Sequence, residues 1–123
     1  DAFACDGVFL LNACADPYGP KTARATMGAI FRRAVYAAAP EELLALLAKS
    51  GIPLYGTALR EDTVPLAGAD LTRAAVAIGS EGRGLSQQLL DNCTKTLKIP
   101  MEARCESLNA AIAAAVVLWE MYR

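Results

Sequence analysis

Apolar residues along this chain fall into two alternating patterns. Short apolar runs bounded by Gly, Pro, Asp or Ser have the length and flanks of buried strands, and they lie at 8–11, 35–37, 52–59, 74–78 and 96–99. Longer segments with helical features lie between and after them, at 21–33, 40–50, 85–92 and 107–122. Because strands alternate with helices, the sequence predicts an α/β fold with a parallel sheet covered by helices on both faces.

The segment 40–50 carries the clearest helix signals. Glu41 and Glu42 lie in its first turn, where the helix dipole is positive, and Lys49 lies in its last turn, where the dipole is negative. Gly51 follows immediately and can adopt the left-handed conformation that ends many helices. We therefore expect this helix to begin and end close to these residues.

Two other segments carry weaker predictions. A helix over 21–33 would place Met27, Ile30 and Phe31 along one apolar face, with its basic residues largely off that face. The segment 60–70 has the polar, Pro and Gly content of a surface loop. Neither prediction changes the α/β assignment.

Length and charge narrow the class of protein. A chain of 123 residues is long enough for one domain with a buried core and too short for two. Hydrophobic residues make up 54% of it and charged residues 20%, which argues against a disordered chain. The net charge of −1 provides no global basic field, so any contact with RNA requires a local patch.

The cysteines and the apolar runs indicate the cellular compartment of the protein. The cysteines form no C-x-x-C pair and the chain has no histidine, so a zinc site is not predicted; they are Cys5, Cys14, Cys93 and Cys105. They fit core thiols in a reducing compartment. The longest apolar run, 110–119, is about half of the roughly 20 residues that a membrane span needs. We therefore expect a cytoplasmic location.

The segment Gly79-Ser80-Glu81-Gly82-Arg83-Gly84-Leu85 joins a predicted strand to a predicted helix. Its glycines allow backbone N–H groups to approach a ligand, although a tight strand-to-helix turn alone would also account for them. It is not the dinucleotide pattern G-x-G-x-x-G, because Glu81 occupies the place of the second glycine. An acidic residue there would repel a pyrophosphate but not a cationic ligand such as a sulfonium.

Two further segments follow in the chain. Ile99-Pro100-Met101 ends a strand with a proline that denies a ladder donor. Glu106-Ser107-Leu108-Asn109-Ala110-Ala111 precedes a strongly apolar helix, and its polar residues could simply cap that helix. An amide just inside an apolar helix needs partners when buried, so we interpret Asn109 as part of a site.

These segments, in this order and spacing, resemble the last two sequence motifs of the SpoU (TrmH-like) RNA ribose methyltransferases of the SPOUT superfamily. The resemblance also includes Ala15-Asp16-Pro17-Tyr18, Lys21, Arg24 and the segment 27–31, so it covers nearly the whole chain. It implies that residues 1–123 form the C-terminal part of the catalytic domain, with a C-terminal trefoil knot and a homodimeric assembly. General topology rules would not predict a knot.

The resemblance also implies an activity: transfer of a methyl group from S-adenosylmethionine to a ribose 2′-hydroxyl of rRNA or tRNA, without a metal. The implied cofactor-binding residues are Thr57, Ala58, Gly79, Ser80, Glu81, Gly82, Gly84, Ile99, Met101 and Leu108. The implied catalytic residues, which would orient cofactor and nucleotide, are Glu81, Ser107 and Asn109. Candidates for RNA phosphate contacts are Lys21, Arg24 and Arg83.

The family's first motif, an Asn-x-Gly-x-x-x-Arg-like segment, does not occur in this sequence. We expect it upstream of Asp1, supplying the central Arg. Two alternatives stay open: a catalytically incomplete cofactor-binding or dimerisation module of the same fold, and an unrelated nucleotide-binding α/β domain. The sequence does not specify which RNA or nucleotide is modified.

Overall fold

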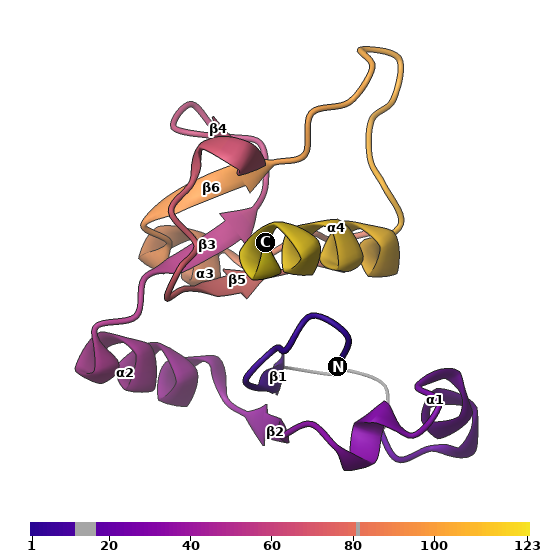
Figure 1. The fold of residues 1–123 in the computed structure, drawn as a ribbon. Helices are drawn as coiled ribbons and strands as arrows, with labels where there is room; N and C mark the ends of the chain where they lie inside the picture. Colours follow the sequence, from indigo (N-terminus) through magenta and orange to yellow (C-terminus); the bar gives the residue numbers. More distant parts are fainter. Residues whose placement is uncertain (12–16, 81) are drawn as a thin grey trace. The chain divides into compact units, whose positions relative to one another are not determined.

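The computed structural model describes residues 1–11, 17–80 and 82–123 and confirms the alternation of strands and helices (Figure 1). Its elements are β1 (Val8–Leu11), α1 (Pro20–Ala25), β2 (Val35–Ala38), α2 (Pro40–Ser50), β3 (Leu54–Thr57), β4 (Val64–Pro65), β5 (Ala75–Ala77), α3 (Gln87–Asn92), β6 (Lys95–Lys98) and α4 (Ala110–Tyr122). Short 3-10 turns lie at Ala29–Phe31 and Leu66–Gly68. The chain divides into two compact units, Asp1–Ala45 and Leu46–Arg123.

The first unit contains a parallel pair of strands. β1 and β2 pair in register from Val8 with Val35 to Leu11 with Ala38, which confirms both predicted strands. The rings of Phe9 and Tyr36, which are direct partners in this register, stack with centroids 5.2 Å apart. Such a cross-strand aromatic pair stabilises the pairing beyond the area that it buries.

The helix predicted over 21–33 is wrong in its second half. α1 ends at Ala25, and the backbone then turns left-handed at Met27 (φ 51°) and Gly28 (φ 87°) before the turn Ala29–Phe31. The left-handed pair interrupts the helical hydrogen-bond ladder, so the expected apolar face does not form. Ile30 is buried, but Met27 is 88% exposed and Phe31 78%.

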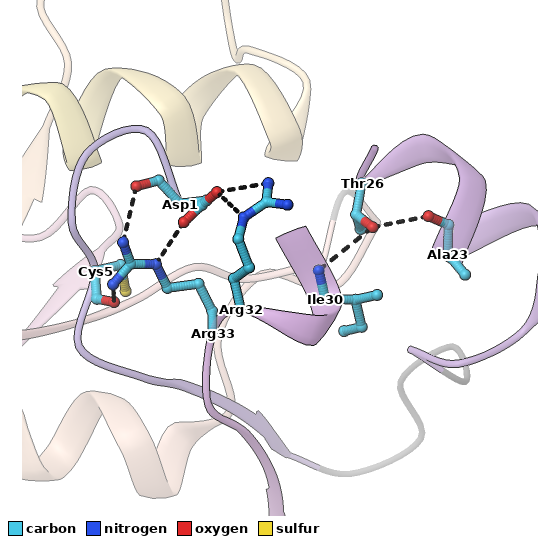
Figure 2. Close-up of polar contacts among 7 residues, drawn as sticks. All are labelled: Asp1, Cys5, Ala23, Thr26, Ile30, Arg32 and Arg33. Atoms are coloured by element: carbon cyan, nitrogen blue, oxygen red, sulfur yellow. Dashed lines mark hydrogen bonds and ion pairs between the residues drawn. The ribbon is translucent and has the colours of Figure 1, made fainter. Parts of the chain in front are cut away.

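Polar contacts hold this turn and the start of the chain (Figure 2). The Thr26 hydroxyl donates to the Ala23 carbonyl over 2.8 Å and accepts from the Ile30 N–H over 3.5 Å. The Asp1 carboxylate lies between two guanidinium groups, 2.7 Å from Nη2 of Arg32 and 2.8 Å from Nε of Arg33. These ion pairs are partly exposed, so we assign each about 0–1 kcal/mol.

The second unit contains a parallel sheet with strand order β4-β6-β3-β5 (Figure 1). Strands β3, β5 and β6 were predicted, but β4 lies in the segment 60–70 that was predicted as a loop. Pro65 is compatible with a strand here because β4 is at the sheet edge, where a missing N–H is tolerated. Leu66 and Leu71, at 4% and 7% exposure, bring the same segment into the core.

Helices cover both faces of this sheet, as predicted. Tyr55 packs against a buried apolar cluster that includes Leu97 of β6 and Val117 of α4. The adjacent residue Gly56 faces the opposite side, where a Cβ would lie 2.7 Å from Leu85 and 2.9 Å from Cys93, the two residues that flank α3. Because successive residues of a strand point to opposite faces, α3 and α4 lie on different sides of the sheet.

Two helices have well-formed caps. The helix α2 ends at Ser50 and Gly51 is left-handed (φ 64°), while Ile52 N–H donates to the Leu47 carbonyl over 3.0 Å. This is a Schellman cap, and it confirms the predicted end of the helix. The helix α3 begins after Ser86, whose hydroxyl accepts from Leu89 N–H over 3.3 Å.

The described residues thus form a mixed α/β fold with two parallel sheets rather than one. The trefoil knot stays a prediction. In the part of the chain that the structure describes, no helix is long and apolar enough to cross a membrane. Within the same residues, no group of three or more His, Cys, Asp or Glu side chains is arranged to hold a metal ion.

Candidate functional site

A cavity of about 720 Å³ lies at one edge of the four-stranded sheet, within the second unit. Its walls include Thr57 at the end of β3, Ile78 just after β5 and Ile99 just after β6. Because these strands are parallel, their carboxyl ends meet at this edge, where ligands of open α/β sheets bind. The size falls within the range of small-molecule sites.

The glycine segment forms one wall of the cavity. Gly84 N–H donates to the Ser80 carbonyl over 2.9 Å, and Gly84 is left-handed at φ 65°, so the segment folds back on itself. Gly79 lies so close to Gly84 that a Cβ on residue 79 would be 2.4 Å from the Gly84 carbonyl carbon. Gly79, Ser80 and Gly84 line the cavity, whereas Gly82 is not among its described lining residues. Glu81 lies outside the described residues.

The connection between β6 and α4 forms another wall. It is an extended loop without regular secondary structure (Figure 1). Met101 and Leu108, at 41% and 36% exposure, line the cavity from this loop together with Ser107. Glu102, Glu106 and Lys98 also line it. Two acidic residues and one basic residue give the lining a net negative charge, which favours a cationic ligand over an anionic one.

Asn109 lies at a different position relative to the helix from the one predicted. α4 begins at Ala110 rather than near Ser107, and Asn109 is its N-cap. The Asn109 Oδ1 accepts from Ala111 N–H over 2.9 Å and from Ile112 N–H over 3.3 Å. The side chain is exposed, so the argument that a buried amide requires a site is wrong. Asn109 still lines the cavity, next to Ser107 and Leu108.

Sequence reasoning missed the apolar floor of the cavity. This floor is formed by buried or half-buried aliphatic residues from the sheet, the turn after β4 and α4: Leu66, Ile78, Leu97, Ala113 and Val117. The alternation in β6 and the continuous apolar pattern of α4 mark most of them as core residues. Leu66 carried no such signal, because Pro65 and Gly68 made its surroundings read as a loop.

None of the proposed RNA-contacting residues is among the described residues that line the cavity. Lys21 and Arg24 are exposed on α1 in the first unit, where Arg24 Nε donates to the Pro20 carbonyl over 3.2 Å. Arg83 is exposed in the second unit and is not one of the described lining residues. Ala15 and Asp16 of the upstream motif, and the predicted core thiol of Cys14, lie outside the described residues.

A parallel sheet with an apolar cavity at its carboxyl edge, walled by a glycine loop, is the arrangement typical of α/β domains with a site for a small organic ligand. The chain belongs to the SpoU rRNA methylase family, whose profile matches residues 1–119. This match confirms the resemblance of the sequence motifs.

Named relatives agree with this family. The chain is 31% identical over 121 residues to a 23S rRNA (guanosine(2553)-2'-O)-methyltransferase of Bacillus subtilis, covering 98% of the chain and 49% of the relative. It is 36% identical over 124 residues to a tRNA (guanosine(18)-2'-O)-methyltransferase of Thermus thermophilus, covering 97% of the chain and 64% of the relative. The chain therefore spans about half to just under two thirds of their lengths.

A solved structure gives the same assignment. The SpoU methyltransferase AviRb of Streptomyces viridochromogenes, in complex with the cofactor AdoMet (S-adenosylmethionine), superposes with a TM-score of 0.90 at 31% identity, covering 99% of this chain and 51% of that one. The comparisons assign the chain to the N-terminal part of its relatives, and do not bear out the expectation of a C-terminal part.

Proposed function

We propose that the whole protein transfers a methyl group from S-adenosylmethionine to a ribose 2′-hydroxyl of rRNA or tRNA. The observation that carries the proposal is the cavity at the carboxyl ends of β3, β5 and β6, whose lining contains residues of all three segments that resemble the family's last two motifs. The names of the relatives, which are rRNA and tRNA 2′-O-methyltransferases, support the substrate class.

The lining of the cavity fits this cofactor. Backbone groups of the folded glycine segment and the strand end at Ile99 could contact an adenosine, and the aliphatic floor could pack against its base. The carboxylates of Glu102 and Glu106 suit a sulfonium cation. Among the proposed cofactor-binding residues, those that line the cavity are Thr57, Ala58, Gly79, Ser80, Gly84, Ile99, Met101 and Leu108.

S-adenosylmethionine would supply a methyl group bonded to a positively charged sulfur. The ribose 2′-oxygen would form a bond to the methyl carbon as the carbon–sulfur bond breaks, and S-adenosylhomocysteine would leave. The chain's own residues would align that oxygen, and alignment lowers the barrier of such a displacement substantially. Ser107 and Asn109 line the cavity and are proposed to orient cofactor and nucleotide, with Glu81 as a third, sequence-based candidate. The weakly acidic hydroxyl also needs a proton acceptor, a role for which the family resemblance points to the first motif.

Contacts with RNA and with a second protomer complete the proposal. Lys21, Arg24 and Arg83 are exposed cations, which supports phosphate contacts. The family resemblance supports a homodimer, a C-terminal trefoil knot and a cytoplasmic location. Each of these stays a prediction.

The test is a transfer assay with the full-length protein, labelled S-adenosylmethionine and separate pools of unmodified rRNA and tRNA. The account predicts that label enters one pool and that the labelled linkage resists alkaline hydrolysis, because a 2′-O-methyl group removes the internal nucleophile. Cofactor binding without transfer to either pool would contradict it and favour the catalytically incomplete module.

A further inference from the structure

A buried polar network lies beneath one wall of the cavity. Thr96 in β6 is fully buried at 0% exposure, and its side chain is on the sheet face opposite Leu97. Its hydroxyl is hydrogen-bonded to the hydroxyl of Thr63, and Asp62 Oδ1 lies 3.5 Å from it. A buried hydroxyl without a partner destabilises a fold, so this contact ties Thr63 firmly to the sheet.

Thr63 in turn fixes the segment that follows β3. Its hydroxyl donates to the Ala58 carbonyl over 3.2 Å and accepts from Arg60 N–H over 2.6 Å. The same turn is closed by Thr63 N–H, which donates to the Arg60 carbonyl over 3.2 Å. One hydroxyl therefore connects the buried end of the network to the backbone just after the strand.

The segment held in this way is a wall of the cavity. Thr57, Ala58 and Leu59 all line it, while Thr63 and Thr96 are not among the described lining residues. The Ala58–Leu59 peptide is trans, so its N–H points opposite to the carbonyl that Thr63 holds. The Thr63 hydroxyl therefore sets the orientation of a backbone donor in the wall without itself reaching the cavity.

We propose that Thr63 is a positioning residue for the cofactor: its hydroxyl, anchored by Thr96, orients the Ala58–Leu59 peptide for S-adenosylmethionine. This inference rests on the proposed function. Valine is nearly isosteric with threonine but lacks the hydroxyl, so T63V removes the positioning contact with little change in volume. T63S retains the hydroxyl.

A double variant separates positioning from stability. T63V leaves the buried Thr96 hydroxyl without its Thr63 partner, which lowers stability. T63V/T96V replaces both hydroxyls by methyl groups, so it regains most of that stability but still lacks the contact to Ala58. T26V in the first unit is the matched control, because Thr26 makes the same kind of contact, donating to one backbone carbonyl and accepting from one backbone N–H.

The experiment measures cofactor affinity by calorimetry and backbone hydrogen exchange at residues 58 and 59 in the full-length protein. We expect about tenfold weaker affinity and faster exchange in both T63V and T63V/T96V, and wild-type values for T63S and T26V. Unchanged exchange in the double variant would overturn the inference even if the wild type binds the cofactor. Wild-type affinity in the double variant would show that Thr63 serves only stability, and this result would also overturn the inference. Absence of binding in the wild type would instead refute the proposed function, and this inference with it.

Discussion

Gly79 and Gly84 approach so closely that any side chain at residue 79 would have its Cβ 2.4 Å from the Gly84 carbonyl carbon and 2.7 Å from its Cα. Both positions are backbone atoms, so no side-chain rotation can relieve the clash. The close approach keeps the glycine segment folded against the end of β5 and forms a wall of the cavity.

Substitution of Gly79 should disrupt the cavity. G79A forces the segment 79–84 to move, so we expect cofactor affinity to fall at least about tenfold, with a loss of about 1–3 kcal/mol in stability. Thermal unfolding and calorimetry measure the two effects. G82A is the stability control, because a Cβ at Gly82 meets no atom within 4 Å. Wild-type affinity in G79A would contradict this account of the wall.

Asn109 variants should separate capping from a role in the site. N109A removes the cap of α4 and should lower the free energy of unfolding by about 0.5–2 kcal/mol. N109S retains a capping oxygen, so it should unfold like the wild type in urea yet turn over more slowly in the full-length protein. If N109A retained normal turnover, the proposed orienting role of Asn109 would be wrong.

Leu66 should behave as a core residue although it lies in a loop-like sequence. It is 4% exposed, so L66A should lower the free energy of unfolding by about 2–5 kcal/mol. Leu59 also lines the cavity but is 77% exposed, and L59A should change stability by no more than about 0.5 kcal/mol. Equal effects of the two substitutions on urea unfolding would show that the second unit is packed differently.

Stability should depend on pH through Cys93. Burial raises the pKa of the Cys93 thiol, an effect that Arg60 opposes and Asp62 reinforces. The folded state therefore retains a proton that the unfolded state loses above its ordinary pKa of about 8.5, so stability falls as pH rises through the alkaline range. Urea midpoints measured from pH 7 to 10 should fall more steeply for the wild type than for C93A. Parallel pH profiles would contradict this assignment.

Strong local signals in the sequence predicted most of the fold. The acidic first turn and Gly51 defined α2, and compact apolar runs defined β1, β3, β5 and β6. The end of α1 at Ala25 was missed because the spacing of the apolar residues outweighed Gly28, whose left-handed backbone lies just beyond the end of the helix. The strand β4 was missed because an edge strand of two residues has no periodicity to detect.

The parts of the candidate site that could be predicted are the motif segments that follow the ends of strands. The individual residues after β3, β5 and β6 were identified from the family resemblance, and their position agrees with the rule that ligands bind at the carboxyl edge of a parallel sheet. The position of Asn109 relative to α4 was misjudged, because a sequence does not show whether an amide lies inside a helix or caps it. The Thr63–Thr96 contact joins residues far apart in the chain, so no local pattern could indicate it.

The most direct test of the central claim is a calorimetric titration of this chain with S-adenosylmethionine, with its demethylated product S-adenosylhomocysteine and with NAD, run beside G79A. The account predicts binding of the first two ligands by the wild type, no binding of NAD, and a marked loss of affinity in G79A. A folded wild-type sample that binds none of the three, or that binds NAD instead, would contradict it.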